Sequence, residues 1–193
     1  VLNLLDLLDY NRISEYTKDI KSIKEINTYF IGFLSMDNSS VNLRRIANEK
    51  IVNPYIDYRY INYNIFNNSD GINYYTIPSI CDITKPINIH IAEGPFDILS
   101  VFYNINNGNK YQNIYTACKG KDYISAIRTY IKLFGIINST FHIYIDNDID
   151  IYPLKEYKDL LYEMYIDVYI HKNTYKDEKD YGVPLSRITD TII

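Results

Sequence analysis

The apolar positions in the first part of the chain follow two different periods. Over residues 1–28 they recur at helical spacing, which predicts two short helices broken near Asn11. Residues 29–46 contain two strand-like runs around a turn-forming Asp-Asn-Ser-Ser cluster, which predicts a hairpin. Two more strand-like runs, RYINYNIF and NYYTIP, follow. The pattern therefore predicts a small mixed α+β lobe over residues 1–85.

After Pro86, strand-like and helix-like segments alternate. In order they are INIHIAE, PFDILSVFYNI, NIYTAC, DYISAIRTYIKLF, FHIYID, LKEYKDLLYEM and IDVYIH. Helix-end signals support this alternation: Pro95 and Pro153 suit first turns, Asp122 an N-cap and Gly135 a C-terminal end. Alternating elements predict a largely parallel sheet flanked by helices over residues 86–176. A C-terminal extension, residues 177–193, follows.

Composition narrows the class of protein. With 193 residues, 47% hydrophobic and 23% charged, the chain is expected to be globular, neither disordered nor a membrane protein. Cys81 and Cys118 are too few for a disulfide framework or a four-cysteine zinc site. No signal peptide is recognised, so we expect a cytoplasmic protein, and the start at Val1 suggests a piece of a longer one. A net charge of −4 argues against binding nucleic acid by bulk charge but allows local basic patches.

Acidic residues close two of the predicted strands. Glu93 ends the first strand of the second domain, and Asp146, Asp148 and Asp150 follow the third. If the chain stays extended there, its two-residue period points these three aspartates the same way. Two like charges about 4 Å apart repel by roughly 4 kcal/mol at an effective dielectric near 20, so converging carboxylates need a cation or a raised pKa. Oxygen ligands alone favour Mg²⁺ or Mn²⁺.

Each of these residues also has a plainer interpretation. An Asp-x-Asp after a strand is often a solvated turn or an N-cap for the next helix. Gly94 after Glu93 permits a tight turn and a close backbone approach to a ligand. Asp97 either supports a metal ion or complements the dipole of the helix that it begins.

These residues resemble a known family. IHIAEGPFDILSVF, followed about fifty residues later by FHIYIDND, is similar to the Toprim fold of topoisomerases, primases, small nucleases and recombination proteins, in which a glutamate closes one strand and an Asp-x-Asp pair another. The Glu93-Gly94-Pro95-Phe96-Asp97 spelling looks most like the catalytic domain of bacterial and phage DNA primases. The chain has Ile149-Asp150 where the family usually continues with Ala-Gly.

Segments outside the acidic motif also resemble DNA primases. Residues 42–45 and 59–63 resemble primase segments that carry an arginine at a strand end and a Lys-Tyr-x-Asn run. Residues 175–181, with Asp177 and Asp180, look like the Asp-Pro-x-Asp region after the last Toprim strand. The resemblance covers about residues 29 to 183, and it implies that Asp177 and Asp180 support the metal site.

The resemblance implies a phage-type DNA primase core that joins ribonucleotides on a single-stranded DNA template during replication. Glu93, Asp146 and Asp148 would be catalytic and would hold Mg²⁺ or Mn²⁺, with Asp150 as a further ligand. The polyanionic template and ribonucleoside triphosphates need cations, for which the candidates are Arg44, Arg45, Arg59, Lys119 and Lys121. Solvated strand edges and loops remain the alternative for these five residues.

Two other functions stay open. A Toprim nuclease would use the same carboxylates to activate water, and a non-catalytic Toprim module would bind nucleic acid or a partner. The zinc module that precedes such primases is not expected within these residues, because the chain has two cysteines. A replicative helicase would bind through regions outside this chain.

Overall fold

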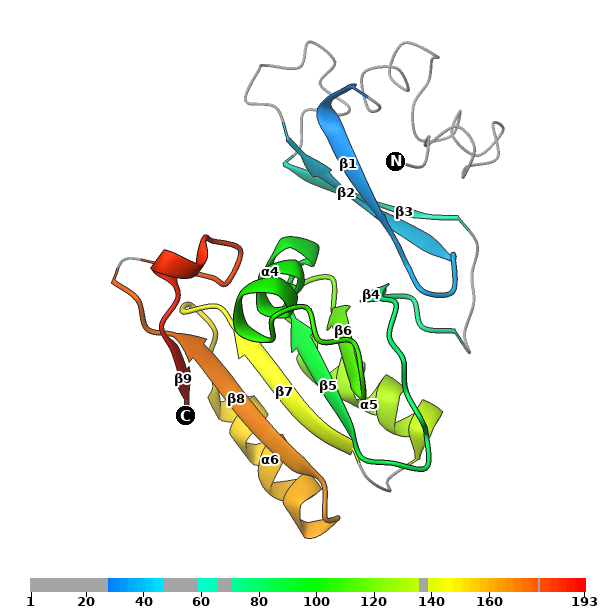
Figure 1. Ribbon diagram of the computed structural model, residues 1–193, viewed down its shortest axis with the longest axis vertical. Helices are drawn as coiled ribbons and strands as arrows, with labels where there is room; N and C mark the ends of the chain where they lie inside the picture. Colours follow the sequence, from blue (N-terminus) through cyan, green and yellow to red (C-terminus); the bar gives the residue numbers. More distant parts are fainter. Residues whose placement is uncertain (1–27, 47–58, 66–70, 136–138, 177) are drawn as a thin grey trace. The chain divides into compact units, whose positions relative to one another are not determined.

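The structure, a computed structural model, describes residues 28–46, 59–65, 71–135, 139–176 and 178–193 (Figure 1). The two helices predicted near the start fall on residues 1–27, outside the described residues. The chain divides into two compact units between Tyr75 and Thr76. Each unit is described by itself.

The first unit contains a three-stranded antiparallel sheet. Its strands β1 (Phe30–Leu34), β2 (Ser40–Arg45) and β3 (Tyr60–Asn64) lie in the order β1-β2-β3. The predicted hairpin is confirmed, because β1 pairs with β2 in antiparallel register. Asp37 stabilises its turn, since Oδ1 accepts hydrogen bonds from the Ser39 backbone N–H at 2.9 Å and from the Ser35 hydroxyl at 2.8 Å.

The second unit is an α/β domain around a six-stranded sheet, ordered β4-β6-β5-β7-β8-β9. The strands are β4 (Tyr75–Ile77), β5 (Ile87–Ala92), β6 (Asn113–Ala117), β7 (Ser139–Ile145), β8 (Asp167–Asn173) and β9 (Asp190–Ile192). β5, β6, β7 and β8 are parallel, whereas β9 pairs antiparallel to β8. The sheet is therefore mixed, with a parallel centre.

The two ends of this sheet differ from the division expected from the sequence. We placed the boundary at residue 85, but β4 already belongs to the second sheet and the units divide ten residues earlier. The predicted C-terminal extension contributes β9 to the same sheet. Short edge strands of three residues carry too little periodicity to be recognised from sequence.

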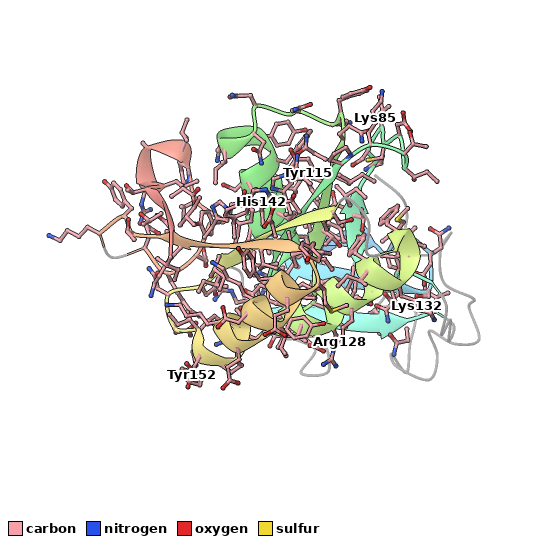
Figure 2. All side chains as sticks on the ribbon, turned by 90° about the horizontal axis from the view of Figure 1, so that it is seen from below. Lys85, Tyr115, Arg128, Lys132, His142 and Tyr152 are labelled. Atoms are coloured by element: carbon pink, nitrogen blue, oxygen red, sulfur yellow. The ribbon has the colours of Figure 1, made fainter. Side chains whose placement is uncertain are left out.

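Helices cover both faces of the second sheet. They are α4 (Pro95–Ser100), which continues into the π-helical turn η1 (Val101–Ile105), α5 (Tyr123–Phe134), α6 (Tyr152–Glu163) and the 3₁₀ turn η2 (Leu185–Arg187). Figure 2 shows α4 on one face, on the side of Tyr115 and His142, and α5 with Arg128 on the opposite face. Buried residues of α5 recur at helical spacing, at Tyr123, Ala126, Ile127 and Tyr130. No helix in the described ranges is long and apolar enough to cross a membrane.

The strand order creates a switch point between β5 and β7. From β5 the chain passes through α4 to β6 on one side, and then through α5 to β7 on the other side. The connection that follows β5 and the connection that follows β7 run to opposite sides of the sheet, and α/β proteins commonly bind ligands beyond the carboxyl ends of strands at such a point. Ala92 is level with Tyr144 in the parallel register, so both strands end at the same edge.

Candidate functional site

Glu93 and Asp146 lie at this switch point, at the ends of two neighbouring parallel strands. Each follows its strand directly, and the structure places both at the carboxyl edge of the sheet, as the sequence analysis predicted. Asp146 is 6% exposed and Glu93 is half-buried. Glu93 Oε2 is buried and has no hydrogen-bond partner among the described residues. A buried carboxylate oxygen without a donor is costly, so this atom marks an incomplete site.

The pKa of Asp146 reflects the carboxylates around it, Glu93, Asp97 and Asp180, which together with Asp146 we call the cluster. Burial, followed by the charges of Glu93, Asp97 and Asp180, raises the pKa of Asp146 to about 7. Lys179 acts in the opposite direction, with its Nζ 3.7 Å from Asp146 Oδ2. The single ammonium does not offset the combined effect of burial and the other carboxylates.

Tyr123 adds a second unpaired group near this edge. Its hydroxyl is buried without a hydrogen-bond partner in the part of the chain that the structure describes. Burial, with the neighbouring charges of Cys118 and Asp146 next in size, raises the pKa of Tyr123. The sequence analysis missed this residue, although it follows the predicted N-cap Asp122. The Tyr123 hydroxyl is available to donate to an acceptor at the site.

Asp97 has the role at the start of its helix that the sequence allowed, while its support of a metal ion stays a prediction. Its Oδ2 accepts a hydrogen bond from the Gly94 backbone N–H at 3.0 Å, which caps the start of α4. Its Oδ1 faces Gly182, because a Cβ built on that glycine would lie 2.8 Å from this oxygen. Asp97 is 8% exposed, so the carboxylate is held inside the cluster by its own helix.

A segment far along the sequence, which we call the strap (residues 178–183), closes the site. The Asn147 backbone N–H donates to the Lys179 carbonyl at 2.7 Å, and the Ser100 hydroxyl donates to the Val183 carbonyl at 3.2 Å. The Gly182 backbone N–H donates to Asp180 Oδ1 at 3.1 Å. The Asp180 carboxylate lies near enough to Asp146 to help raise the pKa of Asp146. Its support of a metal site stays a prediction, and Asp177 lies outside the described residues.

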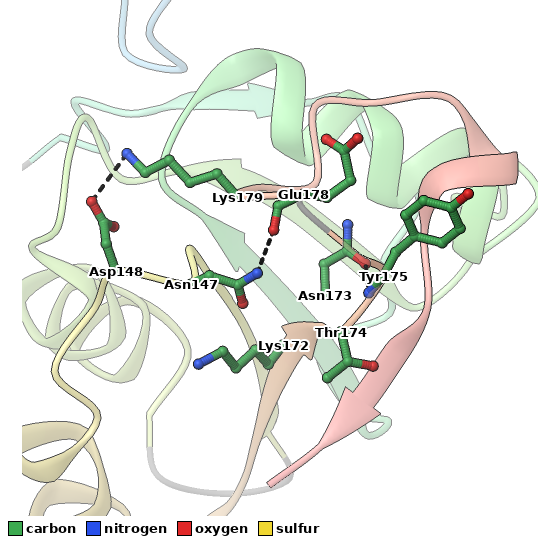
Figure 3. A pocket seen from close by; sticks show the side chains of 8 residues that line it. All are labelled: Asn147, Asp148, Lys172, Asn173, Thr174, Tyr175, Glu178 and Lys179. Carbon is green, nitrogen blue, oxygen red and sulfur yellow. Dashed lines mark hydrogen bonds and ion pairs between the residues drawn. The ribbon is translucent and has the colours of Figure 1, made fainter.

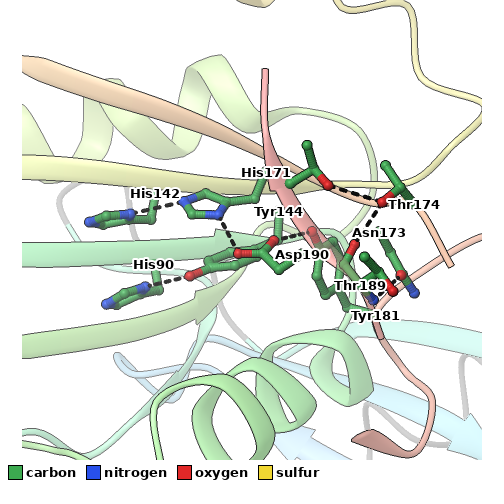
Figure 4. Close-up of polar contacts among 10 residues, drawn as sticks. His90, His142, Tyr144, His171, Asn173, Thr174, Tyr181, Thr189 and Asp190 are labelled. Carbon is green, nitrogen blue, oxygen red and sulfur yellow. Dashed lines mark hydrogen bonds and ion pairs between the residues drawn. The ribbon is translucent and has the colours of Figure 1, made fainter. Parts of the chain in front are cut away.

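Two buried residues, Asn173 of β8 and Tyr181 of the strap itself, fix the strap to the sheet (Figure 4). Asn173 donates from Nδ2 to the carbonyls of Asp180 and Arg187, and its Oδ1 accepts the backbone N–H groups of two further residues. All four bonds that an amide side chain can make are thus used. The Tyr181 hydroxyl donates to Asp190 Oδ1 on β9 at 2.6 Å. The sequence analysis did not select these positioning residues, because their bonds form only when the segment after β8 folds back on the sheet.

The chain does not stay extended after Asp146, so one expectation is wrong. The Ile149 backbone N–H donates to the Asp146 carbonyl at 3.2 Å, which closes a turn and separates the three aspartates. Asp148 is exposed, and ion pairs with Lys179 at 3.1 Å and Lys121 at 3.3 Å lower its pKa. Asp150 Oδ1 accepts the backbone N–H of Tyr152, the first residue of α6, at 3.0 Å and so satisfies one of the free donors at that helix end.

A polar hollow of about 700 Å³ lies beside this turn (Figure 3). Its lining residues are Asn147, Asp148, Lys172, Asn173, Thr174, Tyr175, Glu178 and Lys179. Lys172 and Lys179 give it ammonium groups next to Asp148. The sequence analysis did not select Lys179 as a site residue, although it stands beside Asp180 in a segment already singled out.

The predicted basic residues fall into two groups. Lys119 and Lys121 lie in the loop after β6, which reaches the site because the Gly120 backbone N–H donates to the Glu93 carbonyl at 3.2 Å. Gly120 has a φ of 113°, a conformation that favours glycine and allows this close approach. The three arginines, Arg44, Arg45 and Arg59, belong to the first unit.

The residues at the edge of the second sheet fit a hard divalent cation. In the side-chain positions of the described residues, no three His, Cys, Asp or Glu side chains already form a metal-ligand group. The orphaned Glu93 Oε2 and the crowded Asp146 carboxylate provide the oxygen donors that Mg²⁺ or Mn²⁺ takes. Comparison of the chain with protein-family models, curated proteins and solved structures finds no match. The chemistry of this site is therefore the basis for assigning a function.

Proposed function

We propose that the protein is the catalytic core of a Toprim-type DNA primase, a magnesium-dependent nucleotidyltransferase. It would synthesise short RNA primers on single-stranded DNA during replication. The observation that carries the proposal is the position of Glu93 and Asp146 at the ends of the neighbouring strands β5 and β7, with Glu93 Oε2 buried and without a hydrogen-bond partner among the described residues. A parallel-centred α/β sheet with carboxylates beyond two adjacent strands is what the Toprim resemblance leads us to expect.

Each residue of the cluster has a role in this proposal. Glu93 and Asp146 bind Mg²⁺ or Mn²⁺, and Asp148 and Asp180 complete the negative field from either side. When bound, the ion would lower the pKa of the primer 3′-hydroxyl and stabilise charge on the transferring phosphoryl group. Asp97 fixes the start of α4 next to Glu93, because its carboxylate accepts the hydrogen bond of the Gly94 backbone N–H.

The lysines beside the cluster carry the positive charge that the triphosphate of a nucleotide substrate needs. Lys121 and Lys179 both pair with the exposed Asp148, at 3.3 and 3.1 Å. Exposed ion pairs of this kind contribute little to stability, so these ammonium groups can exchange Asp148 for a triphosphate. The polar hollow that contains Lys172 lies next to them and can take an anionic group.

The proposal places the protein among DNA and nucleotide partners. Its template is single-stranded DNA and its substrates are ribonucleoside triphosphates, and a replicative helicase would bind through other regions of a longer protein. A phage enzyme of this type would act in the host cytoplasm as part of a primosome.

Primer synthesis tests the proposal directly. The purified chain is incubated with single-stranded DNA, labelled ribonucleoside triphosphates and Mg²⁺ or Mn²⁺, and the products are resolved by length. We expect short labelled RNA with metal and none with EDTA or with Glu93→Gln. Metal-dependent cleavage of the DNA without incorporation would instead support the Toprim nuclease. Binding without either reaction would support a non-catalytic module.

A further inference from the structure

One face of the sheet in the first unit carries an exposed row of side chains. The antiparallel registers place Ile31 opposite Arg44, and Arg44 opposite Tyr60, so the three side chains share a face. The guanidinium of Arg44 lies 5.7 Å from the centroid of the Tyr60 ring. Tyr60 is 57% exposed, whereas Tyr63 on the other face of β3 is buried. The structure thus separates an exposed tyrosine from a core tyrosine.

The same end of this sheet concentrates positive charge. Arg44, Arg45 and Arg59 are three of the six arginines in a chain whose net charge is −4. The Arg45 backbone N–H donates to the Arg59 carbonyl at 3.0 Å, so the arginines at the end of β2 and the start of β3 are neighbours. Arginines gathered at one point of an acidic protein indicate an anionic partner.

An amide group continues the row along β3. Asn62 is exposed and lies two residues from Tyr60, on the same face of the strand. Its Oδ1 accepts a hydrogen bond from Asn42 Nδ2 at 2.5 Å, which fixes the side chain. The Asn62 amide N–H groups remain as donors for the edge of a base. Cation, exposed ring and amide together match the groups with which proteins bind single-stranded nucleic acid.

A second arginine–tyrosine pair in the chain shows what a packing role looks like. Arg128 of α5 lies 5.4 Å from the ring centroid of Tyr157 of α6, and Tyr157 is half-buried between the helices. That pair is explained by helix packing. The Arg44–Tyr60 pair has nearly the same geometry, but its ring is mostly exposed.

We propose that the Ile31–Arg44–Tyr60 face is a stacking platform for the bases of single-stranded nucleic acid. A base stacks on the exposed Tyr60 ring and the Arg44 plane, and the Arg44 guanidinium also contacts an adjacent phosphate. Arg45 and Arg59, which neighbour Arg44 and Tyr60 along the chain and so alternate to the other face, add positive charge at the same end of the sheet. The inference rests on the proposed function in that its ligand is the same single-stranded polymer. It assigns to this face a contact with bases, beyond the phosphate contacts expected from the sequence.

Binding measured without metal ions or nucleoside triphosphates tests the platform. Fluorescence anisotropy is used with labelled oligo-dT and with an abasic oligomer of equal length. Tyr60→Leu is expected to weaken oligo-dT binding about tenfold. Its abasic binding should be unchanged, and Tyr60→Phe should restore the affinity for oligo-dT. The matched control Tyr157→Leu should bind oligo-dT as the wild type does.

The salt dependence separates stacking from phosphate contacts. Arg44→Ala should reduce the slope of log affinity against log salt by about 0.7, the value for one phosphate contact to a single strand. Tyr60→Leu should leave that slope unchanged. Circular dichroism melting of each variant checks that the sheet remains folded.

Two results would overturn the platform. One is a Tyr60→Leu variant that binds oligo-dT as tightly as the Tyr157→Leu control. The other is an equal loss for oligo-dT and the abasic oligomer, which would leave only backbone contacts. Neither result bears on primer synthesis, and absence of primer synthesis with intact base-dependent binding would contradict the catalytic proposal alone.

Discussion

Two groups of buried titratable residues in the same sheet differ in how completely they are paired. On one face, His90 bonds through both ring nitrogens, Nε2 to Asn113 Oδ1 at 3.0 Å and Nδ1 to the Tyr144 hydroxyl at 3.2 Å. At the carboxyl edge, Glu93 Oε2 has no partner among the described residues and Asp146 shares one ammonium. The first group is complete within the protein, and the second is not.

The histidine group extends as a relay across three strands (Figure 4). Asp190 Oδ2 lies 2.9 Å from His171 Nδ1, and His171 Nε2 lies 3.0 Å from His142 Nδ1. An ionised Asp190 accepts a hydrogen bond from His171 Nδ1–H, and Nε2 of a neutral His171 then accepts a hydrogen bond from His142 Nδ1–H. All three histidines of the chain are thereby assigned to structure.

The number of hydrogen-bond partners that a buried polar side chain has helps to distinguish a structural role from a functional one. A buried polar group with a full set of partners stabilises a unique packing, whereas one that lacks a partner retains its cost unless a ligand supplies it. By this criterion the histidines and Asn173 hold the fold. Glu93 and Asp146 are incompletely paired, and we propose that a cation from outside the chain completes them.

The largest effect is expected from Asp146→Asn. Loss of one ligand should reduce primer synthesis to background. The same change removes a charge from the repelling cluster, so the free energy of unfolding without metal should rise by about 1–2 kcal/mol at pH 7, after allowance for solvent screening. Urea unfolding and the incorporation assay measure both. Asp159→Asn on α6 is the surface control, and incorporation at the wild-type level by Asp146→Asn would exclude it as a ligand.

Lower pH should destabilise the histidine group. Burial lowers the pKa of His90 to about 3 and that of His142 to about 4. The unfolded chain binds these protons from about pH 6.5 downward, whereas the folded chain binds them only near pH 3 to 4. The free energy of unfolding therefore decreases as the pH is lowered from about 6.5. His90 alone should cost about 2 kcal/mol between pH 7 and pH 5.

The variant His90→Phe isolates this contribution, because it keeps a ring in the stack with Tyr115 but cannot titrate. Urea unfolding at both pH values should show a smaller pH difference than in the wild type. Asp146→Asn should act in the opposite sense, since a raised pKa stabilises at low pH and that stabilisation is lost as pH rises toward 7. Equal pH differences in wild type and His90→Phe would mean that His90 is not buried in the neutral form.

Gly182→Ala probes the contact between the strap and the cluster. The added Cβ would lie 2.8 Å from Asp97 Oδ1, and Asp97 is held by the Gly94 N–H, so one of them must move. We expect primer synthesis to fall about tenfold, the size of effect found when a residue supporting metal ligands is displaced. Ser186→Ala, in the exposed η2 turn, should have no effect. A fully active Gly182→Ala enzyme would show that the strap position is unimportant.

The smallest effect is expected at Asp150. Because its side chain satisfies the Tyr152 backbone N–H at the start of α6, Asp150→Ala should lower the free energy of unfolding by about 1 kcal/mol, and Asp150→Asn, which keeps an acceptor oxygen, should not. Both variants should retain primer synthesis. A strong loss of activity in Asp150→Asn would restore the role of metal ligand that its spacing suggested.

Local patterns in the sequence were sufficient to predict the central strands and helices of the second unit and the positions of two acidic residues. The alternation of strands and helices after residue 86, and the positions of Glu93 and Asp146 directly after two strands, follow from periodicity and parallel topology. The turn that separates Asp148 from Asp146 and the three-residue strand β9 do not, because too few residues are involved.

The closing of the site could not be predicted from local patterns. The strap contacts Asn147, Ser100 and β9 across long sequence separations, so its course depends on tertiary packing. Lys179 and Tyr123 become noticeable only once the strap and α5 are placed beside the carboxylates. Incomplete hydrogen bonding, which carries the functional argument, is likewise a property of the folded chain alone.

Direct binding of Mn²⁺ tests the central claim that the carboxyl edge lacks a cation. Isothermal titration calorimetry of the purified chain with Mn²⁺, without DNA or nucleotides, should show saturable binding. Glu93→Gln should abolish this binding, and His90→Phe should preserve it. Equal Mn²⁺ affinity in wild type and Glu93→Gln, or no binding by the folded wild type, would contradict the claim.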